Sequence, residues 1–115
     1  MKVAITIWGN RVSPVFDSAN TLMIAQIEHS KIVSRIYERF NPKLTTRIAS
    51  ILNHFRIDAL ICGAITESQS EAIEQGGIKL ISFVSGDFNK ILVSYINKPH
   101  QISEYLMPGA VTDTT

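Results

Sequence analysis

Residues 2–8 read KVAITIW, an almost unbroken run of β-branched and apolar side chains. A strand of this composition buries both of its faces, so it lies inside a sheet and not at the edge. Two further strand patterns follow, TLMIAQIE from Thr21 and KIVSRIYE from Lys31. Only the short link 28–30 separates them, and a link of that length joins antiparallel neighbours. The first part of the chain therefore predicts a central strand flanked by a hairpin.

The chain then changes from strand to helix periodicity. NPKLTTRIASILNHF, residues 41–55, starts with a capping asparagine and a proline at the first helical position, and its apolar residues recur at helical spacing. A short apolar strand, IDALICGAI, begins at Ile57 and stops at Gly63. A Thr-x-x-Gln capping box at Thr66 then predicts a helix over 67–75.

One more strand and one more helix complete the pattern. The strand IKLISFV begins at Ile78, and Asp87 has the position of a cap for the helix that follows it. One face of this helix is apolar and carries Phe88, Ile91, Leu92 and Tyr95. From residue 98 onward the chain has the composition of a polar tail.

Strands that alternate with helices pair in parallel through right-handed crossovers. The sequence therefore predicts an α/β fold of three layers. Its mixed five-stranded sheet contains three parallel strands plus an antiparallel hairpin, and three helices cover the faces. A chain of 115 residues has the size of one domain. We expect this domain to span residues 1–97, followed by a C-terminal tail over 98–115.

The composition excludes several classes of function. With 45% hydrophobic residues, 18% charged residues and a net charge of +1, the chain resembles a soluble globular protein. Lysine and arginine form no basic run, so we expect no nucleic-acid partner. No apolar run approaches the ~20 residues of a membrane span, and the start lacks a signal-peptide pattern, which predicts a cytoplasmic protein without a membrane partner. The single cysteine, Cys62, excludes an internal disulfide.

Ligands of open α/β sheets bind beyond the carboxyl ends of the parallel strands, where helix N-termini also point. Three segments should meet there: the loop 9–16, the turn 62–66 and the turn 84–87. Each has a glycine and a hydroxyl side chain near a backbone bend, which suits the close approach of a small anionic or polar group. The expected binding residues are Asn10, Arg11, Ser13, Phe16, Cys62, Gly63, Thr66, Ser85 and Gly86.

Each of these signals has a structural explanation beside the functional one. Gly63 and Gly86 fit plain turns as well as a ligand cradle. Arg11 either clamps an anion with two hydrogen bonds or is simply solvated. Cys62 is either a small buried hydrophobic residue or a thiolate ligand. The 3 histidines are not expected to converge, so the sequence predicts no metal site. The sequence also offers no nucleophilic or acid-base pair, so we do not expect an enzyme.

Three stretches of the chain carry a resemblance to a known family. They are MKVAITIWGNRVSPVFDSA at 1–19, IDALICGAI at 57–65 and GGIKLISFVSGDFNKIL at 76–92. Together they resemble the dinitrogenase iron-molybdenum cofactor biosynthesis family over residues 1–97, and the VSPVFD loop is the most specific element. The resemblance implies a ribonuclease H-like α/β fold without nuclease residues.

The resemblance also implies binding and not catalysis, since family members carry or store an iron-molybdenum cofactor or its iron-sulfur precursor. In such members the loop often has a histidine directly before the phenylalanine and a cysteine a few residues later. This chain has Val15 and Ala19 at those positions, and Ala110 where relatives have a cysteine after a Met-Pro-Gly motif. The resemblance thus implies a non-catalytic binding protein that lacks the usual metal-ligating side chains. We expect backbone amides, hydroxyl groups and Arg11 to bind an iron-molybdenum cofactor or iron-sulfur cluster without ligating its metal ions.

Two other functions fit the same residues. In the first, the chain is an adaptor that docks on a protein partner through the segment YLMPGAVTDTT at 105–115. The structural explanation of the same segment is a frayed terminus. Alternatively, the chain binds another small anionic ligand at the three turns. A homodimer is a further expected partnership, formed through an exposed sheet edge such as the strand 32–38.

Overall fold

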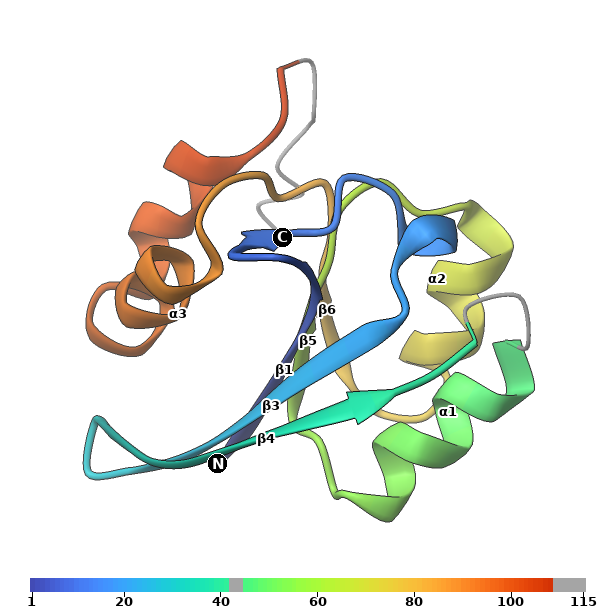
Figure 1. Cartoon of the computed structure of the whole chain (residues 1–115), viewed down its shortest axis with the longest axis horizontal. Helices are drawn as coiled ribbons and strands as arrows, with labels where there is room; N and C mark the ends of the chain where they lie inside the picture. Colours follow the sequence, from blue (N-terminus) through green and yellow to red (C-terminus); the bar gives the residue numbers. More distant parts are fainter. Residues whose placement is uncertain (42–44, 109–115) are drawn as a thin grey trace.

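The structure is a computed structural model that describes residues 1–41 and 45–108. A mixed sheet stands between two layers of helices, with α3 on one face and α1 and α2 on the other (Figure 1). Its six strands are β1 (Lys2–Trp8), β2 (Arg11–Val12), β3 (Thr21–Glu28), β4 (Lys31–Arg39), β5 (Ala59–Ile61) and β6 (Lys79–Ile81). The helices are α1 (Thr45–His54), α2 (Glu67–Glu74) and α3 (Phe88–Asn97), with 3-10 turns η1 (Phe16–Ser18) and η2 (Pro99–Tyr105). The three-layer mixed α/β prediction is confirmed.

The strand order is β4-β3-β1-β5-β6, and β2 pairs with the end of β1. β1 is antiparallel to β3 and parallel to β5, while β5 is parallel to β6. The predicted central strand and its flanking hairpin are therefore confirmed. The hairpin link has positive φ at both central residues, 52° at His29 and 61° at Ser30, as a two-residue type I′ turn requires.

The observed elements differ from the predicted ones mainly at their ends. The predicted strands 57–63 and 78–84 each keep only three ladder residues, because the chain beyond them turns to bond with other loops. β2 was not expected: Gly9, at φ 63°, turns the chain back so that Arg11 pairs with Trp8. The predicted first helical position, residue 42, lies outside the described residues.

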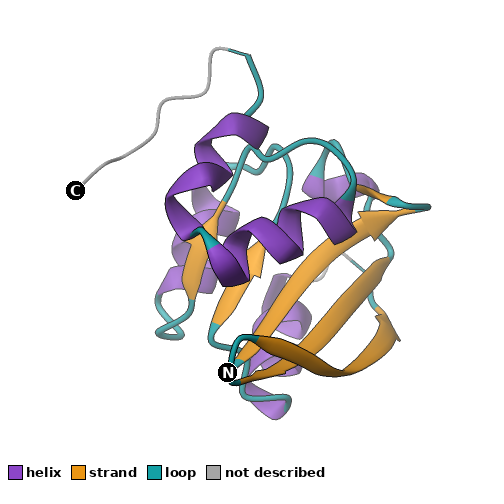
Figure 2. Cartoon of the chain, turned by 90° about the vertical axis from the view of Figure 1, so that its left-hand side faces the viewer, coloured by secondary structure: helices purple, strands orange, loops and turns teal. Residues whose placement is uncertain are grey.

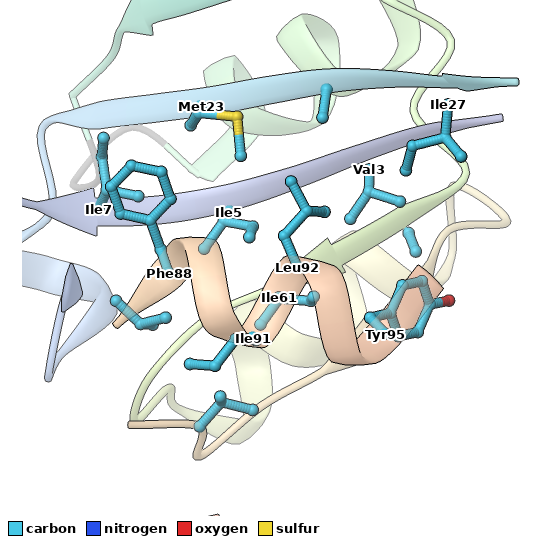
Figure 3. Close-up of a cluster of buried hydrophobic side chains, with 14 residues drawn as sticks. Val3, Ile5, Ile7, Met23, Ile27, Ile61, Phe88, Ile91, Leu92 and Tyr95 are labelled. Atoms are coloured by element: carbon cyan, nitrogen blue, oxygen red, sulfur yellow. The ribbon is translucent and has the colours of Figure 1, made fainter. Parts of the chain in front are cut away.

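Two hydrophobic clusters hold the layers together, one on each face of the sheet. Figure 3 shows the first, in which Leu92 of α3 points toward Val3 and Ile5 of β1. The opposite cluster includes Ala4 of β1, because successive strand residues face opposite sides of the sheet. That second cluster contains Ala4, Phe16, Ala19, Leu22, Ile24, Phe40, Ile48, Leu52, Ile57, Leu60, Cys62, Ile73 and Ile78.

Residues 99–107, predicted from their composition to belong to a tail, fold back against α3 (Figure 2). The Ser85 amide donates to the Tyr105 carbonyl at 2.7 Å, and the Met107 amide donates to the Phe83 carbonyl at 2.7 Å. Val84 and Leu106 form an antiparallel bridge between these two bonds. The part of this segment up to residue 107 is therefore an ordered piece of the folded unit. The final segment 109–115, with Ala110, lies outside the described residues.

No helix in the described ranges combines the length and the apolar character that crossing a membrane requires.

Candidate functional site: the strand-end face

The three predicted segments do meet beyond the carboxyl ends of β1, β5 and β6, and we call this surface the strand-end face. The Val12 amide donates to the Gly86 carbonyl at 2.9 Å, which joins the loop 9–16 to the turn before α3. On its other side the Phe16 amide donates to the Ala64 carbonyl at 2.8 Å, and the Ala64 amide donates to the Pro14 carbonyl at 2.9 Å. The loop thus lies between the two turns and is bonded to both.

Gly63 allows this close joint. A Cβ atom at this position would lie 2.2 Å from the Ser13 carbonyl oxygen and 2.4 Å from the Pro14 carbonyl oxygen. Real Cβ atoms do not approach backbone atoms so closely, so the loop requires glycine here. Of the two explanations considered for Gly63, the structural one is sufficient.

The helix N-termini at this face are already capped by side chains. In α2, the Thr66 hydroxyl accepts from the Gln69 amide at 3.2 Å, and the Gln69 side chain accepts from the Thr66 amide in return. In α3, the Asp87 carboxylate accepts from the amides of Asn89 at 2.9 Å and Lys90 at 3.0 Å. Both predicted caps are confirmed. These amides are occupied, so a ligand would have to displace a cap in order to bind them.

The nine expected binding residues fall into two groups by exposure. Asn10, Arg11 and Thr66 are exposed, and Ser85 and Gly86 are half-buried. Ser13, Phe16, Cys62 and Gly63 are buried, the first donating its hydroxyl hydrogen to the Val15 carbonyl at 3.0 Å. Phe16 packs on Phe40 with 5.9 Å between ring centroids. The buried group shapes the loop from below, and the exposed group is the part a ligand can reach.

The exposed apolar side chains of this face are not among the residues predicted from the sequence. Trp8 is 65% exposed, Val15 is 44% exposed and Phe83 is 40% exposed. Phe83 also has a positive φ of 61°, which is rare for a bulky residue. Its amide bonds to Gly63 and its carbonyl accepts from Met107, so the surrounding turns fix this conformation. The sequence could have indicated Trp8, because it ends the strand pattern at residue 8 directly before Gly9. It contained no signal for the conformation of Phe83.

The cysteine at this face is closed to solvent. Cys62 has no exposed surface, and burial raises the pKa of its thiol to about 12. At neutral pH it is therefore a protonated thiol, which neither ligates metals well nor reacts as a nucleophile. This favours the buried-hydrophobe explanation over the ligand explanation.

We predict that the native protein reacts with an aromatic disulfide reagent at least about a hundredfold more slowly than the chain unfolded in guanidinium chloride. The raised pKa and the burial of Cys62 both suppress the thiolate in the folded state. Following the released chromophore in both conditions measures this ratio. Equal rates at pH 8 would show that the strand-end face opens to expose the thiol.

The donors for a metal cluster are sparse. Across residues 1–41 and 45–108, no group of three or more histidine, cysteine, aspartate or glutamate side chains could hold a metal ion. Cys62 stays protonated, and Val15 and Ala19 carry no donor atoms. The described residues therefore do not fit direct ligation of an iron-molybdenum cofactor or an iron-sulfur cluster.

Comparison with solved structures shows the same fold in other proteins. The crystal structure of PH0822 superposes with a TM-score of 0.76 at 16% identity, covering 84% of this chain and 88% of that one. A candidate dinitrogenase of Methanocaldococcus jannaschii superposes in its crystal form with a TM-score of 0.68 at 22% identity, over 84% of this chain and 88% of that one. An NMR structure of the same candidate dinitrogenase, with the organism given as Methanococcus jannaschii, superposes with a TM-score of 0.71 at 20% identity, covering 96% of this chain and 95% of that one.

Sequence comparison supplies the family. No curated protein sequence matches the chain. Residues 1–98, however, match the family described as dinitrogenase iron-molybdenum cofactor, and this range includes β1 through α3 and all three segments of the strand-end face. The chain belongs to the dinitrogenase iron-molybdenum cofactor family.

Proposed function

We propose that this chain is a non-catalytic binding protein of iron-molybdenum cofactor biosynthesis that binds an anionic cargo on the strand-end face. The cargo belongs to the class of metal-sulfur anions and keeps its own metal ligands. Arg11 and Asn10 contact it from outside, and the chain supplies no metal-ligating side chain. Membership of the family supports the biosynthetic setting.

The observation that carries this proposal is the exposure and position of Arg11. This side chain projects from β2, which is bonded to β1 on one side and to the turn at Gly86 on the other. Within the described ranges, no hydrogen bond or ion pair engages its guanidinium. An arginine that is held on a rigid strand and not already paired can bind an anion with two parallel hydrogen bonds.

The nearby Asp87 does not pair with the positive charge of Arg11. Asp87 forms a backbone bridge with Arg11, but its carboxylate is turned to the amides of Asn89 and Lys90. Its negative charge therefore stabilises the start of α3. The exposed ring of Trp8, which pairs with Arg11 across the β1–β2 turn, adds an apolar surface beside the cation.

We predict that Arg11→Ala raises the dissociation constant for tetrathiomolybdate, a soluble metal-sulfur dianion, about tenfold, or about 1.4 kcal/mol. Loss of a charge-assisted bond at a partly solvated site has this size. Anaerobic equilibrium dialysis with molybdenum analysis measures it. Lys79→Ala is the matched control, because it removes one exposed positive charge from the opposite end of the sheet.

Equal weakening by Arg11→Ala and Lys79→Ala would show that only net charge matters, and would refute the assigned site. Failure of the wild-type protein to retain tetrathiomolybdate at any tested concentration would refute the cargo class.

A second function is favoured by the exposed apolar residues Trp8, Val15 and Phe83 on the same face. Aromatic side chains in such positions are typical of protein-binding surfaces. The chain would then be an adaptor that docks on the protein carrying the cofactor. Trp8→Ala separates the two, since an adaptor would lose its protein partner while tetrathiomolybdate binding would depend mainly on Arg11.

A further inference from the structure

The two edge strands of the sheet, β4 and β6, have different surroundings. Beyond β6, the segment 83–85 is covered by the chain itself, through the bonds to Tyr105 and Met107. At the other end of the strand order stands β4, which pairs only with β3 among the described residues. The outer side of such a strand presents unpaired amides and carbonyls that can pair with another strand.

β4 has charged side chains and one register irregularity, which protect an edge strand, but it lacks other protective features. It is 9 residues long and contains neither proline nor glycine. Three apolar side chains are well exposed on it: Val33 at 54%, Ile36 at 43% and Tyr37 at 56%. The register shift opposite Gln26 and Ile27 leaves Val33 outside the regular ladder, so the regular part of the strand begins at Ser34.

We propose that β4 pairs with β4 of a second copy of this chain, antiparallel, about a two-fold axis at Ile36. Such an axis runs perpendicular to the sheet, so the same face of both copies lies on the same side. Residues directly opposite each other in antiparallel strands point to the same face. The axis therefore passes between two copies of one residue, and Ile36 lies opposite the partner's Ile36. Arg35 lies opposite the partner's Tyr37, and Ser34 lies opposite the partner's Glu38.

Charge selects this register over its neighbours. An axis at Arg35 would set two Arg35 side chains against each other, with Lys31 opposite the partner's Arg39. An axis at Tyr37 would set Arg35 opposite the partner's Arg39. Like charges directly opposite destabilise a strand pair. An axis at Ser34 would put the irregular residue Val33 beside the centre.

With the axis at Ile36, the facing side chains are complementary. The two Ile36 side chains bury each other, and the guanidinium of Arg35 meets the ring of the partner's Tyr37, an arrangement favoured by cation–π attraction. Arg35 already donates to the side-chain oxygen of Asn89 on α3, which limits its freedom before pairing. The joined hairpins would form one continuous sheet of two subunits.

Engineered disulfides test the register. Ile36→Cys should give a covalent dimer with oxidised glutathione, which takes up the two electrons and two protons of the thiols. Residues directly opposite in antiparallel strands have Cα atoms about 4.5–5.5 Å apart, within the range that a disulfide spans. Cys62 is buried and does not compete.

The matched variants are Ser34→Cys, Arg35→Cys and Tyr37→Cys, and we expect at least about tenfold slower cross-linking for each. Fastest cross-linking at any of these three positions would overturn the register. Comparable slow rates at all four would indicate random collision and overturn the strand pairing.

Oligomeric state tests the interface without a new thiol. Sedimentation equilibrium should show wild-type protein moving from the chain mass of 12.8 kDa toward twice that mass as concentration rises. Ile36→Lys sets two like charges at the axis and should remove the dimer. Gln75→Lys, at an exposed position directly after α2, is the control and should leave the dimer unchanged. A wild-type protein that is monomeric at about 1 mM would overturn the proposal, because a Kd weaker than that marks no stable association.

Discussion

Replacing Gly63 by alanine is expected to lower the free energy of unfolding by about 3 kcal/mol or more, at the upper end of what overpacking costs. The new methyl group would lie 2.2 Å and 2.4 Å from two backbone oxygens of residues 13 and 14. Those oxygens cannot rotate away, because the Ser13 amide is bonded to the Thr6 carbonyl at 2.9 Å. The loop must separate from the turn, and the Ala64 bond to Pro14 is lost with it.

Gly9→Ala is the control for this prediction. Gly9 has a φ of 63°, so alanine is strained there, but no atom lies within 4 Å of the added Cβ. The cost should be the backbone term alone, about 1 kcal/mol. Urea unfolding followed by circular dichroism measures both variants. If the two variants lost the same stability, the collision with the loop would not be the cause.

Leu92→Ala should destabilise the protein by about 2–5 kcal/mol. Leu92 has no exposed surface and points from α3 into the cluster around Val3 and Ile5 (Figure 3). Truncation removes buried methyl groups and leaves a cavity that the β1 side of the core cannot fill, since β1 is held by neighbours on both sides. Thermal or urea unfolding gives the loss directly.

The adjacent residue provides the control. Val93 on the same helix is 48% exposed, so Val93→Ala should change stability by no more than about 0.5 kcal/mol. Similar losses for the two variants would mean that α3 does not pack on the sheet through the face that contains Leu92.

Features governed by local chemistry could be predicted from the sequence. The composition of residues 2–8 placed β1 inside the sheet, and the short link 28–30 required a hairpin. The capping box at Thr66 and the cap at Asp87 were recognisable, because a cap depends on residues only a few positions apart. The meeting of the three turns followed from the parallel topology alone.

Features governed by distant contacts could not be predicted. The strands after Ile57 and Ile78 are short because bonds to other loops, at Pro14 and Phe83, redirect the chain. The segment 99–107 reads as polar, yet the backbone of residues 83–85 gives it a partner. Four of the expected binding residues, Ser13, Phe16, Cys62 and Gly63, therefore lie beneath the surface.

The joint between the loop and the turn at Val15 and Ala64 bears on how such a site can evolve. The two residues form a parallel bridge, and every bond that closes the joint runs between main-chain atoms. The side chain at position 15 is 44% exposed and takes no part in these bonds. Mutation there can therefore add or remove a chemical group while the architecture persists. One backbone scaffold can in this way present different side chains at position 15 without a change of fold.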